Sequence, residues 1–276
     1  MSNFYVVATP IGNLADITLR ALEVLKSCEI IFCEDSRITL RLLQKYDIKN
    51  KKLLVYNDNS NHEDRQKILN YLQNGKDIAF VSDAGTPLIS DPGYKLIEFL
   101  QEQNCKIVPI PGASSLTAAL CVSGVAIDNF LFLGFLPNST LQRKNILQNL
   151  PKNFTFTIFE NANRVIDVLQ EILEVLGNRK IAIVREITKI HEEIIKNDTK
   201  NLLQFFEKNQ EKLRGEFVII VEKQDKNTQN ISDEDLKKEI KKLLRKGLSV
   251  KDVSEELAEV YDINKKTIYK LAIANF

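Results

Sequence analysis

The chain has 276 residues, of which 44% are hydrophobic and 27% are charged, and its formal net charge at pH 7 is +1. This length fits two medium-sized domains with a small addition better than one minimal core, and the composition is ordinary for a soluble globular protein. No apolar run approaches the ~20 residues that cross a bilayer, and a net charge near zero restricts any nucleic-acid surface to a local basic patch.

The first 112 residues alternate between short apolar runs and longer segments with helical spacing of apolar residues. The apolar runs predict strands at residues 4–8, 30–33, 53–56, 78–81 and 106–109. The intervening segments predict helices at residues 17–28, 36–45, 61–73 and 94–103. Strands that alternate with helices in this way indicate a mostly parallel sheet with helices on both faces.

A second unit follows the segment PIPGA at 109–113, which is typical of a domain junction. Its predicted strands are residues 130–135, 155–159, 181–184 and 217–221, and its predicted helices are residues 116–122, 164–176 and 201–208. We therefore expect an N-terminal α/β domain at 1–112 and a C-terminal α/β domain at 113–224.

The last part of the chain differs from both units. Residues 224–231 are polar and predict a linker, and residues 232–276 carry helical periodicity only. Helices at 236–244, 249–261 and 265–274, with a turn near 262–264, indicate a helix-turn-helix-like appendix. A group of basic residues in its first helix is either a phosphate-binding face or a solvated side of an amphipathic helix: Lys237, Lys238, Lys241, Lys242, Arg245 and Lys246.

Metal binding is not expected from the cysteines and histidines. The four cysteines lie in apolar stretches without a C-x-x-C pair, and the two histidines are His62 and His191. This pattern is atypical of a zinc site and typical of reduced, buried thiols in a cytosolic protein. Residues 1–13 have no basic segment before their apolar run, which favours a buried first strand over a signal peptide. We therefore expect a cytoplasmic protein without a metal.

The segment 81–93, VSDAGTPLISDPG, is the clearest candidate for a ligand site. Gly85 and Gly93 allow positive φ or a close approach of backbone to a ligand, while Pro87 and Pro92 stiffen the loop. The loop follows a predicted parallel strand, and ligands of open α/β sheets bind at the carboxyl ends of such strands. It is neither G-x-G-x-x-G nor a P-loop. The pattern alone therefore leaves two interpretations. The loop either binds a small molecule that the pattern does not identify, or it is a structural connection that binds no ligand.

Seven segments taken together resemble the successive motifs of the tetrapyrrole methylase superfamily and, more narrowly, its small-subunit ribosomal RNA methyltransferase I family. They occur in order: VATPIGNLADIT at 7–18, CEDSR at 33–37, VSDAGTPLISDPG at 81–93, PIPGASSLTAAL at 109–120, FENANR at 159–164, VREITKIHEE at 184–193 and RGEFVIIVE at 214–222. Residues 247–272 resemble the helix-turn-helix module of many members. The resemblance covers roughly residues 4–223 and implies two α/β domains with S-adenosylmethionine in the cleft between them.

The resemblance also implies which residues bind this cofactor. Those expected at the cofactor are Pro10, Gly12, Asp83, Ala84, Gly85, Pro87, Leu88, Ile89, Ser114 and Ser115. For the two serines, capping of the helix that follows them is an equally good interpretation.

The reaction that the resemblance implies is 2′-O-methylation of a cytidine ribose in the decoding region of 16S ribosomal RNA. The protein must align the hydroxyl with the methyl group and help to remove its proton. The candidate catalytic residues are Glu34, Asp35, Arg37, Glu186 and Lys189, and the candidate substrate-binding residues are Glu160, Arg164, Arg185 and Glu216. Lys189 beside Glu186 is either a proton acceptor of lowered pKa or a fixed cation, and a purely structural ion-pair network is the alternative for each charged residue.

One segment departs from the family pattern. Members often have Ser-Pro-His before the arginine at 164, whereas this chain has Asn161-Ala162-Asn163, and we expect Asn163 to replace the histidine through hydrogen bonds. The expected partners are 16S ribosomal RNA or the small ribosomal subunit, and a second copy of the chain in a homodimer. Two alternatives stay open, namely a precorrin-type tetrapyrrole methylase and a non-catalytic RNA-binding assembly protein.

Overall fold

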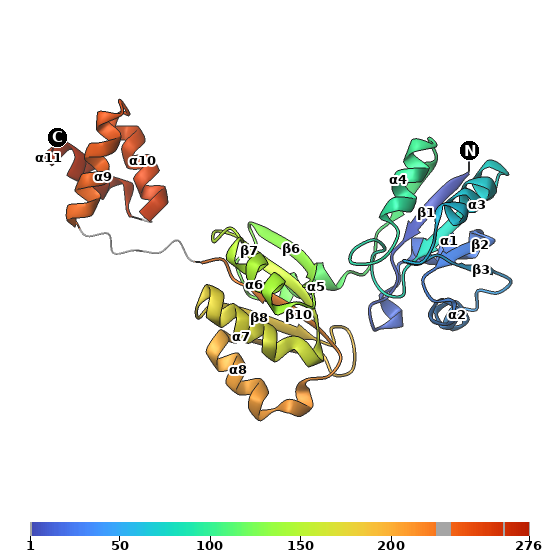
Figure 1. Ribbon diagram of the computed structural model, residues 1–276. Coiled ribbons are helices and arrows are strands. Elements are labelled where there is room, and N and C mark those ends of the chain that lie inside the picture. The colour runs from blue at the N-terminus through green and yellow to red at the C-terminus, as the bar shows by residue number, and fades with distance from the viewer. Residues whose placement is uncertain (1, 225–232, 262, 276) are drawn as a thin grey trace.

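The computed structural model describes residues 2–224, 233–261 and 263–275. They form two five-stranded sheets with their helices, followed by a group of three C-terminal helices (Figure 1). The expectation of two α/β domains with a helical appendix is confirmed. The unit that contains the first sheet (residues 3–110) is called the first domain below, the unit at 115–221 the second domain, and the helices at 233–275 the tail.

The first sheet is parallel throughout, as its alternating pattern predicts, with the strand order β3-β2-β4-β1-β5. Its strands are β1 (Asn3–Val7), β2 (Ile30–Cys33), β3 (Lys52–Val55), β4 (Ile78–Val81) and β5 (Lys106–Ile110). The central strands alternate between two apolar cores, one on each face. Helices α1 (Leu19–Ser27) and α2 (Ser36–Lys45) cover one face, and α3 (His62–Gln73) and α4 (Tyr94–Glu102) cover the other.

Because all five strands run in the same direction, the loops that follow them emerge at one edge of the sheet. The loop after β1 and the loop after β4 are tied together there by an antiparallel bridge between Thr9 and Gly85. The Thr9 amide donates to the Gly85 carbonyl at 2.9 Å, and the Gly85 amide donates to the Thr9 carbonyl at 3.0 Å. This pairing fixes the segment 81–93 against the first strand.

The second sheet is mixed, with the strand order β6-β7-β10-β8-β9. Its strands are β6 (Phe130–Phe135), β7 (Thr155–Asn161), β8 (Lys180–Arg185), β9 (Glu193–Asp198) and β10 (Glu216–Val221). Strand β10 lies antiparallel between β7 and β8. The larger core packs α6 (Thr140–Gln148), α7 (Val165–Leu176) and α8 (Thr199–Lys208) on one face, and α5 (Ser115–Val122) packs on the other.

Several details differ from the sequence prediction. Helix α6 and strand β9 were not expected, because α6 buries only Arg143 and Leu147 and β9 is a half-exposed edge strand. The first helix begins at Leu19 because the Thr18 hydroxyl caps it, accepting from the Ala21 amide at 3.1 Å. The expectation of buried thiols holds for Cys28 and Cys33, whereas Cys105 is half-buried and Cys121 is exposed on α5, and all four cysteines are free.

The tail consists of α9 (Asp233–Arg245), α10 (Val250–Tyr261) and α11 (Lys265–Asn275), which bury an apolar core of their own. The expected linker at 224–231 lies outside the described residues except for Gln224, and so does Asp262 of the expected turn. Among the described residues, none of the helices has the length and apolar character needed to span a membrane.

Candidate functional site

A cavity of about 270 Å³ lies where the carboxyl edge of the first sheet meets the second domain. The first domain contributes the loops after β1, β2 and β4, and the second contributes the start of α5 and the ends of β6, β7 and β10. The lining residues are Ile11, Glu34, Asp83, Ala84, Gly85, Thr86, Ile89, Ser90, Asp91, Ser114, Ser115, Phe135, Phe159, Glu160, Asn161, Ile187, Glu216, Phe217 and Val218. This position is where ligands bind in open α/β sheets.

The loop 81–93 reaches the cavity through an unusual backbone. Gly85 and Gly93 have φ values of +81° and +132°, and the non-glycine residues Leu88 and Ser90 also lie in the left-handed region, at +73° and +65°. Left-handed non-glycine residues cost energy and cluster at functional sites. The loop is therefore held in a conformation that its own residue preferences do not favour.

The structure brings together six of the ten residues expected at the cofactor, namely Asp83, Ala84, Gly85, Ile89, Ser114 and Ser115. Leu88 instead packs against the apolar core under α3 and α4. Pro10 lines a smaller neighbouring cavity of about 200 Å³ that shares Asp83, and Pro87 lines neither cavity. The other glycine of the set, Gly12, lies at a contact between the domains described below.

The capping interpretation of the two serines is wrong for Ser114. It occupies the N-cap position of α5, but its side chain makes no capping hydrogen bond within the part of the chain that the structure describes. Ser115 is the first residue of the helix. Both serines therefore line the cavity, and the Ser114 side chain does not cap the helix.

Three carboxylates of the first domain line the cavity, and Asp91 among them was not expected from the sequence. Burial, and then repulsion by Asp83 and Asp91, raises the pKa of Glu34. Burial likewise raises the pKa of Asp83, whose Oδ1 accepts a hydrogen bond from the Asp35 amide at 2.9 Å, and of Asp91. Crowded carboxylates in a partly desolvated cavity favour a ligand that carries positive charge.

The candidates Asp35 and Arg37 lie outside the cavity lining. The Asp35 carboxylate caps α2 by accepting from the Arg37 amide at 2.8 Å, and it pairs with the Arg37 guanidinium at 2.5 Å. These hydrogen bonds lower the pKa of Asp35 to about 2. The Arg37 side chain is 85% exposed. Asp35 therefore positions Asp83 through its backbone, and the Arg37 side chain faces solvent.

The expected pair of Lys189 and Glu186 is present and includes a third member. The Lys189 Nζ lies 2.8 Å from Glu186 Oε1 and 2.9 Å from Glu216 Oε2. Burial opposes the charge of Lys189, but hydrogen bonds to the two carboxylates outweigh it and raise its pKa. A lysine of raised pKa keeps its proton at neutral pH, so the geometry supports a fixed cation and not a proton acceptor.

The loop that carries this lysine closes on the first domain. A Cβ on Gly12 would lie 2.6 Å from Lys189 Cγ and 2.7 Å from Thr188 Oγ1, and the Asn13 amide donates to Thr188 Oγ1 at 3.1 Å. Glu186 and Thr188 both have positive φ. Gly12 is thus a residue of close contact between the two domains.

The remaining expected residues lie in the second domain. Glu160 is 1% exposed and lines the cavity, and its carboxylate lies 3.1 Å from the Arg164 guanidinium. Arg164 donates to Asn138 Oδ1 and to the Leu136 carbonyl, each at 2.8 Å. Arg185 pairs with Glu193 at 2.9 Å across the β8–β9 pair and lies outside the cavity lining.

Sequence reasoning missed the apolar wall of the cavity. Its members come from β6, β7, β10 and the loop after β8, and they are Phe135, Phe159, Ile187, Phe217 and Val218. The rings of Phe135 and Phe159 meet edge to face with centroids 5.7 Å apart. Carboxylates on one side and aromatic residues on the other suit a ligand with a cationic part and a flat apolar part.

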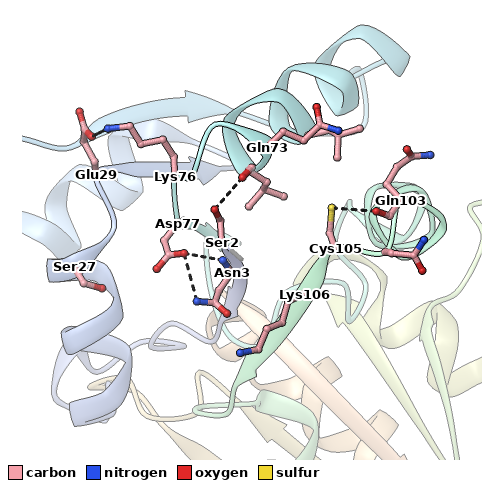
Figure 2. A pocket seen from close by; sticks show the side chains of 14 residues that line it. Ser2, Asn3, Ser27, Glu29, Gln73, Lys76, Asp77, Gln103, Cys105 and Lys106 are labelled. Atoms are coloured by element: carbon pink, nitrogen blue, oxygen red, sulfur yellow. Dashed lines mark hydrogen bonds and ion pairs between the residues drawn. The ribbon is translucent and has the colours of Figure 1, made fainter.

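A larger opening of about 730 Å³ lies at the opposite, amino edge of the first sheet. Figure 2 shows that polar side chains surround it, with Lys76 paired to Glu29 at 2.8 Å and Asp77 accepting from the Asn3 amide at 2.7 Å. Because ligands of parallel sheets bind at the carboxyl edge, we do not assign this opening as the site. In the described ranges, no group of three or more His, Cys, Asp or Glu residues is placed to hold a metal ion.

Comparison with known proteins agrees with this geometry. A family model described as tetrapyrrole (corrin/porphyrin) methylases matches residues 3–203. The ribosomal RNA small subunit methyltransferase I of Rickettsia prowazekii is 42% identical over 98% of this chain and 96% of its own length. The protein of the same name from Thermotoga maritima is 41% identical over 222 residues, which cover 80% of this chain and 98% of that protein.

Solved structures agree on the fold. A cobalt-precorrin-4 methyltransferase of cobalamin biosynthesis superposes with a TM-score of 0.60 over 80% of this chain and 94% of its own, at 16% identity. From the family model and the long matches to curated relatives, the chain belongs to the tetrapyrrole methylases and, within them, to the ribosomal RNA small subunit methyltransferase I family.

Proposed function

We propose that this protein is an S-adenosylmethionine-dependent methyltransferase that methylates the 2′-hydroxyl of a cytidine ribose in the decoding region of 16S ribosomal RNA. The observation that carries the proposal is the carboxylate-lined cavity between the two domains, built around the loop 81–93. Membership of a family whose members are named for ribosomal RNA methylation supports the choice of acceptor.

The residues of the cavity fit the proposed donor. When bound, S-adenosylmethionine supplies an electrophilic methyl group on a positively charged sulfur. Glu34, Asp83 and Asp91 offset positive charge in the cavity, and the bare backbone at Gly85 permits close approach of a ligand. The hydroxyls of Ser114 and Ser115 provide donors and acceptors for its polar groups.

The remaining candidate residues contribute to the reaction from around the cavity. Lys189, held by Glu186 and Glu216, supplies a fixed positive charge that stabilises an oxygen as it loses its proton. Arg37 offers an exposed guanidinium for RNA phosphate. Arg164 orients Glu160, and Asp35 holds Asp83 through its amide.

The proposal extends to the assembly in which the protein works. Its partner is 16S ribosomal RNA or the small ribosomal subunit in the cytoplasm, and a second copy of the chain in a homodimer supplies further RNA-binding surface. The folding units are residues 1–112, 113–224 and 232–276, of which the last is an RNA-binding addition to the catalytic part.

Transfer of a labelled methyl group to small subunits that lack the modification tests the proposal. The unaltered protein is expected to label such subunits and to fail when the target 2′-hydroxyl is replaced by hydrogen. Labelling that survives this replacement contradicts ribose methylation. Labelling of porphyrinoid acceptors in place of subunits favours the precorrin-type alternative, and the absence of S-adenosylmethionine binding in calorimetry favours a non-catalytic RNA-binding protein.

A further inference from the structure

A second cleft opens at the carboxyl edge of the first sheet, beside the cavity between the domains. It has a volume of about 490 Å³ and is lined by residues 56–58, 60–62, 65 and 91–95, which belong to the loop after β3, the start of α3 and the start of α4. We call it the α3–α4 cleft. Asp91 lines both this cleft and the cavity, so the two adjoin each other at that residue.

The walls of the α3–α4 cleft are fixed by packing and by hydrogen bonds. Tyr56 is 3% exposed, and its ring meets Phe80 edge to face with centroids 6.0 Å apart. The backbone at Gly93 lies so close to the same phenylalanine that a Cβ there would be 3.1 Å from its ring. In the loop after β3, Ser60 Oγ accepts from the Asn57 amide at 3.0 Å. The cleft is therefore formed before any ligand binds, as binding sites usually are.

Three side chains at the cleft are available to contact a ligand. Tyr94, the first residue of α4, is 65% exposed. Arg65 is half-buried and Lys95 is exposed, and neither side chain forms an ion pair or hydrogen bond with a residue that the structure describes. Proteins hold single-stranded nucleic acids with such a combination, since the aromatic ring stacks on a base and the cations contact phosphates.

The acidic residues of the cleft narrow the choice of ligand. Asp58 and Asp91 also line it, so two carboxylates balance the charges of Arg65 and Lys95. A bare phosphate would gain little from a lining without net charge. A nucleotide suits the mixture better, because carboxylates accept hydrogen bonds from the amino group of a base while the cations contact its phosphate.

We propose that the α3–α4 cleft binds a nucleotide of the acceptor RNA that neighbours the methylated ribose. This inference rests on the proposed function and adds an RNA-binding subsite to it. The ring of Tyr94 stacks on the base, and Arg65 and Lys95 contact the adjacent phosphates. Because the cleft adjoins the cavity, a nucleotide held there positions the next ribose for reaction with the donor.

The first test replaces Tyr94 in the full-length protein, with unmodified small subunits as acceptor. Tyr94→Ala should raise KM for subunits by at least about fivefold, because it removes the stacking ring. Tyr94→Phe, which keeps the ring, should stay close to the unaltered protein. Co-sedimentation with subunits should show the same loss of affinity without turnover. The affinity for S-adenosylmethionine in calorimetry and the Tm should hardly change, since the side chain is exposed.

The second test removes the two cations of the cleft. Arg65→Gln combined with Lys95→Gln should make the dependence of log kcat/KM on log salt less steep by about 1 to 2, because two phosphate contacts are lost. The matched control combines Lys26→Gln with Lys67→Gln, which removes the same charge from exposed positions on α1 and α3 outside the lining. The control should keep the salt dependence of the unaltered protein.

The inference and the proposed function fail in different ways. Absence of transfer to small subunits by the unaltered protein contradicts the proposed function. Normal transfer with an unchanged KM in Tyr94→Ala, or with equal salt dependence in the cleft variant and its control, contradicts the inference alone. A loss of affinity for S-adenosylmethionine with KM for subunits unchanged would assign the cleft to the donor and would also overturn it.

Discussion

At Gly85 the chain needs a residue without a side chain for two separate reasons. Its φ of +81° lies in the left-handed region, and a Cβ there would lie 3.2 Å from Cγ2 of Ile11. Gly75 in the same domain has nearly the same φ, +79°, but open space around it. Both Gly85→Val and Gly75→Val should lose about 1–2 kcal/mol of stability from backbone strain, and Gly85→Val alone should weaken donor binding, by about tenfold or more.

Calorimetric titration of both variants with S-adenosylmethionine, alongside thermal denaturation, checks this expectation. The Gly75 variant separates the effect of backbone strain from the effect at the cavity. Equal donor affinities in the two variants would mean that the loop is a structural connection and not a ligand site.

The carboxylate of Asp91 is expected to favour binding of S-adenosylmethionine and to lower the stability of the folded protein at neutral pH. Burial first, and then Asp83 and Asp58, raise its pKa. A carboxyl whose pKa is higher in the folded than in the unfolded chain stabilises the fold below its unfolded pKa, and this contribution is lost as the pH rises through the folded pKa. Asp91→Asn should therefore raise the Tm at pH 7 and leave it nearly unchanged at about pH 3, below the ordinary pKa of an aspartate.

The same substitution should weaken binding of S-adenosylmethionine at neutral pH, because one of the three carboxylates loses its charge. Thermal denaturation at the two pH values and calorimetry at pH 7 measure the two effects. A Tm shift of equal size at both pH values would show that packing, and not the charge of Asp91, decides its contribution.

At the scale of elements, the strands and helices of the first domain were predictable because each carries its own pattern. The position of the loop 81–93 at the carboxyl edge of the sheet was predictable from its glycines and prolines after a buried strand, and several of its residues line the cavity. Helix α6 was not, because its buried side includes Arg143, whose burial depends on a distant partner, Glu171. The apolar wall of the cavity was also missed, since Phe159 and Phe217 become neighbours of the loop only through the packing of one domain on the other.

The loop 186–189 depends on Gly215, the residue just before β10. A Cβ on Gly215 would overlap the carboxylate of Glu186, which holds Lys189. Gly215→Ala should therefore displace Glu186, release Lys189 and lower the methyl transfer rate. Gly177→Ala is the matched control, because Gly177 has a similar φ, +78°, with nothing near its Cβ position.

Rate measurements and thermal denaturation of the two variants separate the effect of backbone strain from the effect of displacing Glu186 and Lys189. Both should show the strain of a left-handed alanine, about 1 kcal/mol, and only Gly215→Ala should lose activity beyond it. If both variants keep full activity, the fixed position of Lys189 is not needed for the reaction.

At the scale of the whole molecule, the cavity is a product of two domains that each fold around their own cores. Neither domain alone supplies both the carboxylates and the aromatic wall. The contact of Gly12 and Asn13 with Thr188 and Lys189 holds the two parts together beside the cavity. The order of motifs along the chain could predict that two units share a site, but the contact itself required the packing of both.

The tail should be separable from this two-domain unit. It buries its own core of apolar residues from α9, α10 and α11, and the Thermotoga maritima relative is matched over nearly its whole length by 222 residues of this chain. Deletion of residues 225–276 should therefore leave the affinity for S-adenosylmethionine and the Tm of the remaining protein close to their original values. If the basic residues of α9 contact RNA phosphates, the deletion should raise KM for small subunits and reduce the dependence of kcat/KM on salt.

Replacement of Lys237 and Lys241 by glutamine in the full-length protein is the matched variant for the tail, because it removes charge and keeps the helices. It should reproduce the change in salt dependence with donor affinity unchanged. Deletion that abolishes donor binding would mean that the tail completes the cavity. An unchanged KM in both variants would mean that its lysines form a solvated face with no part in RNA binding.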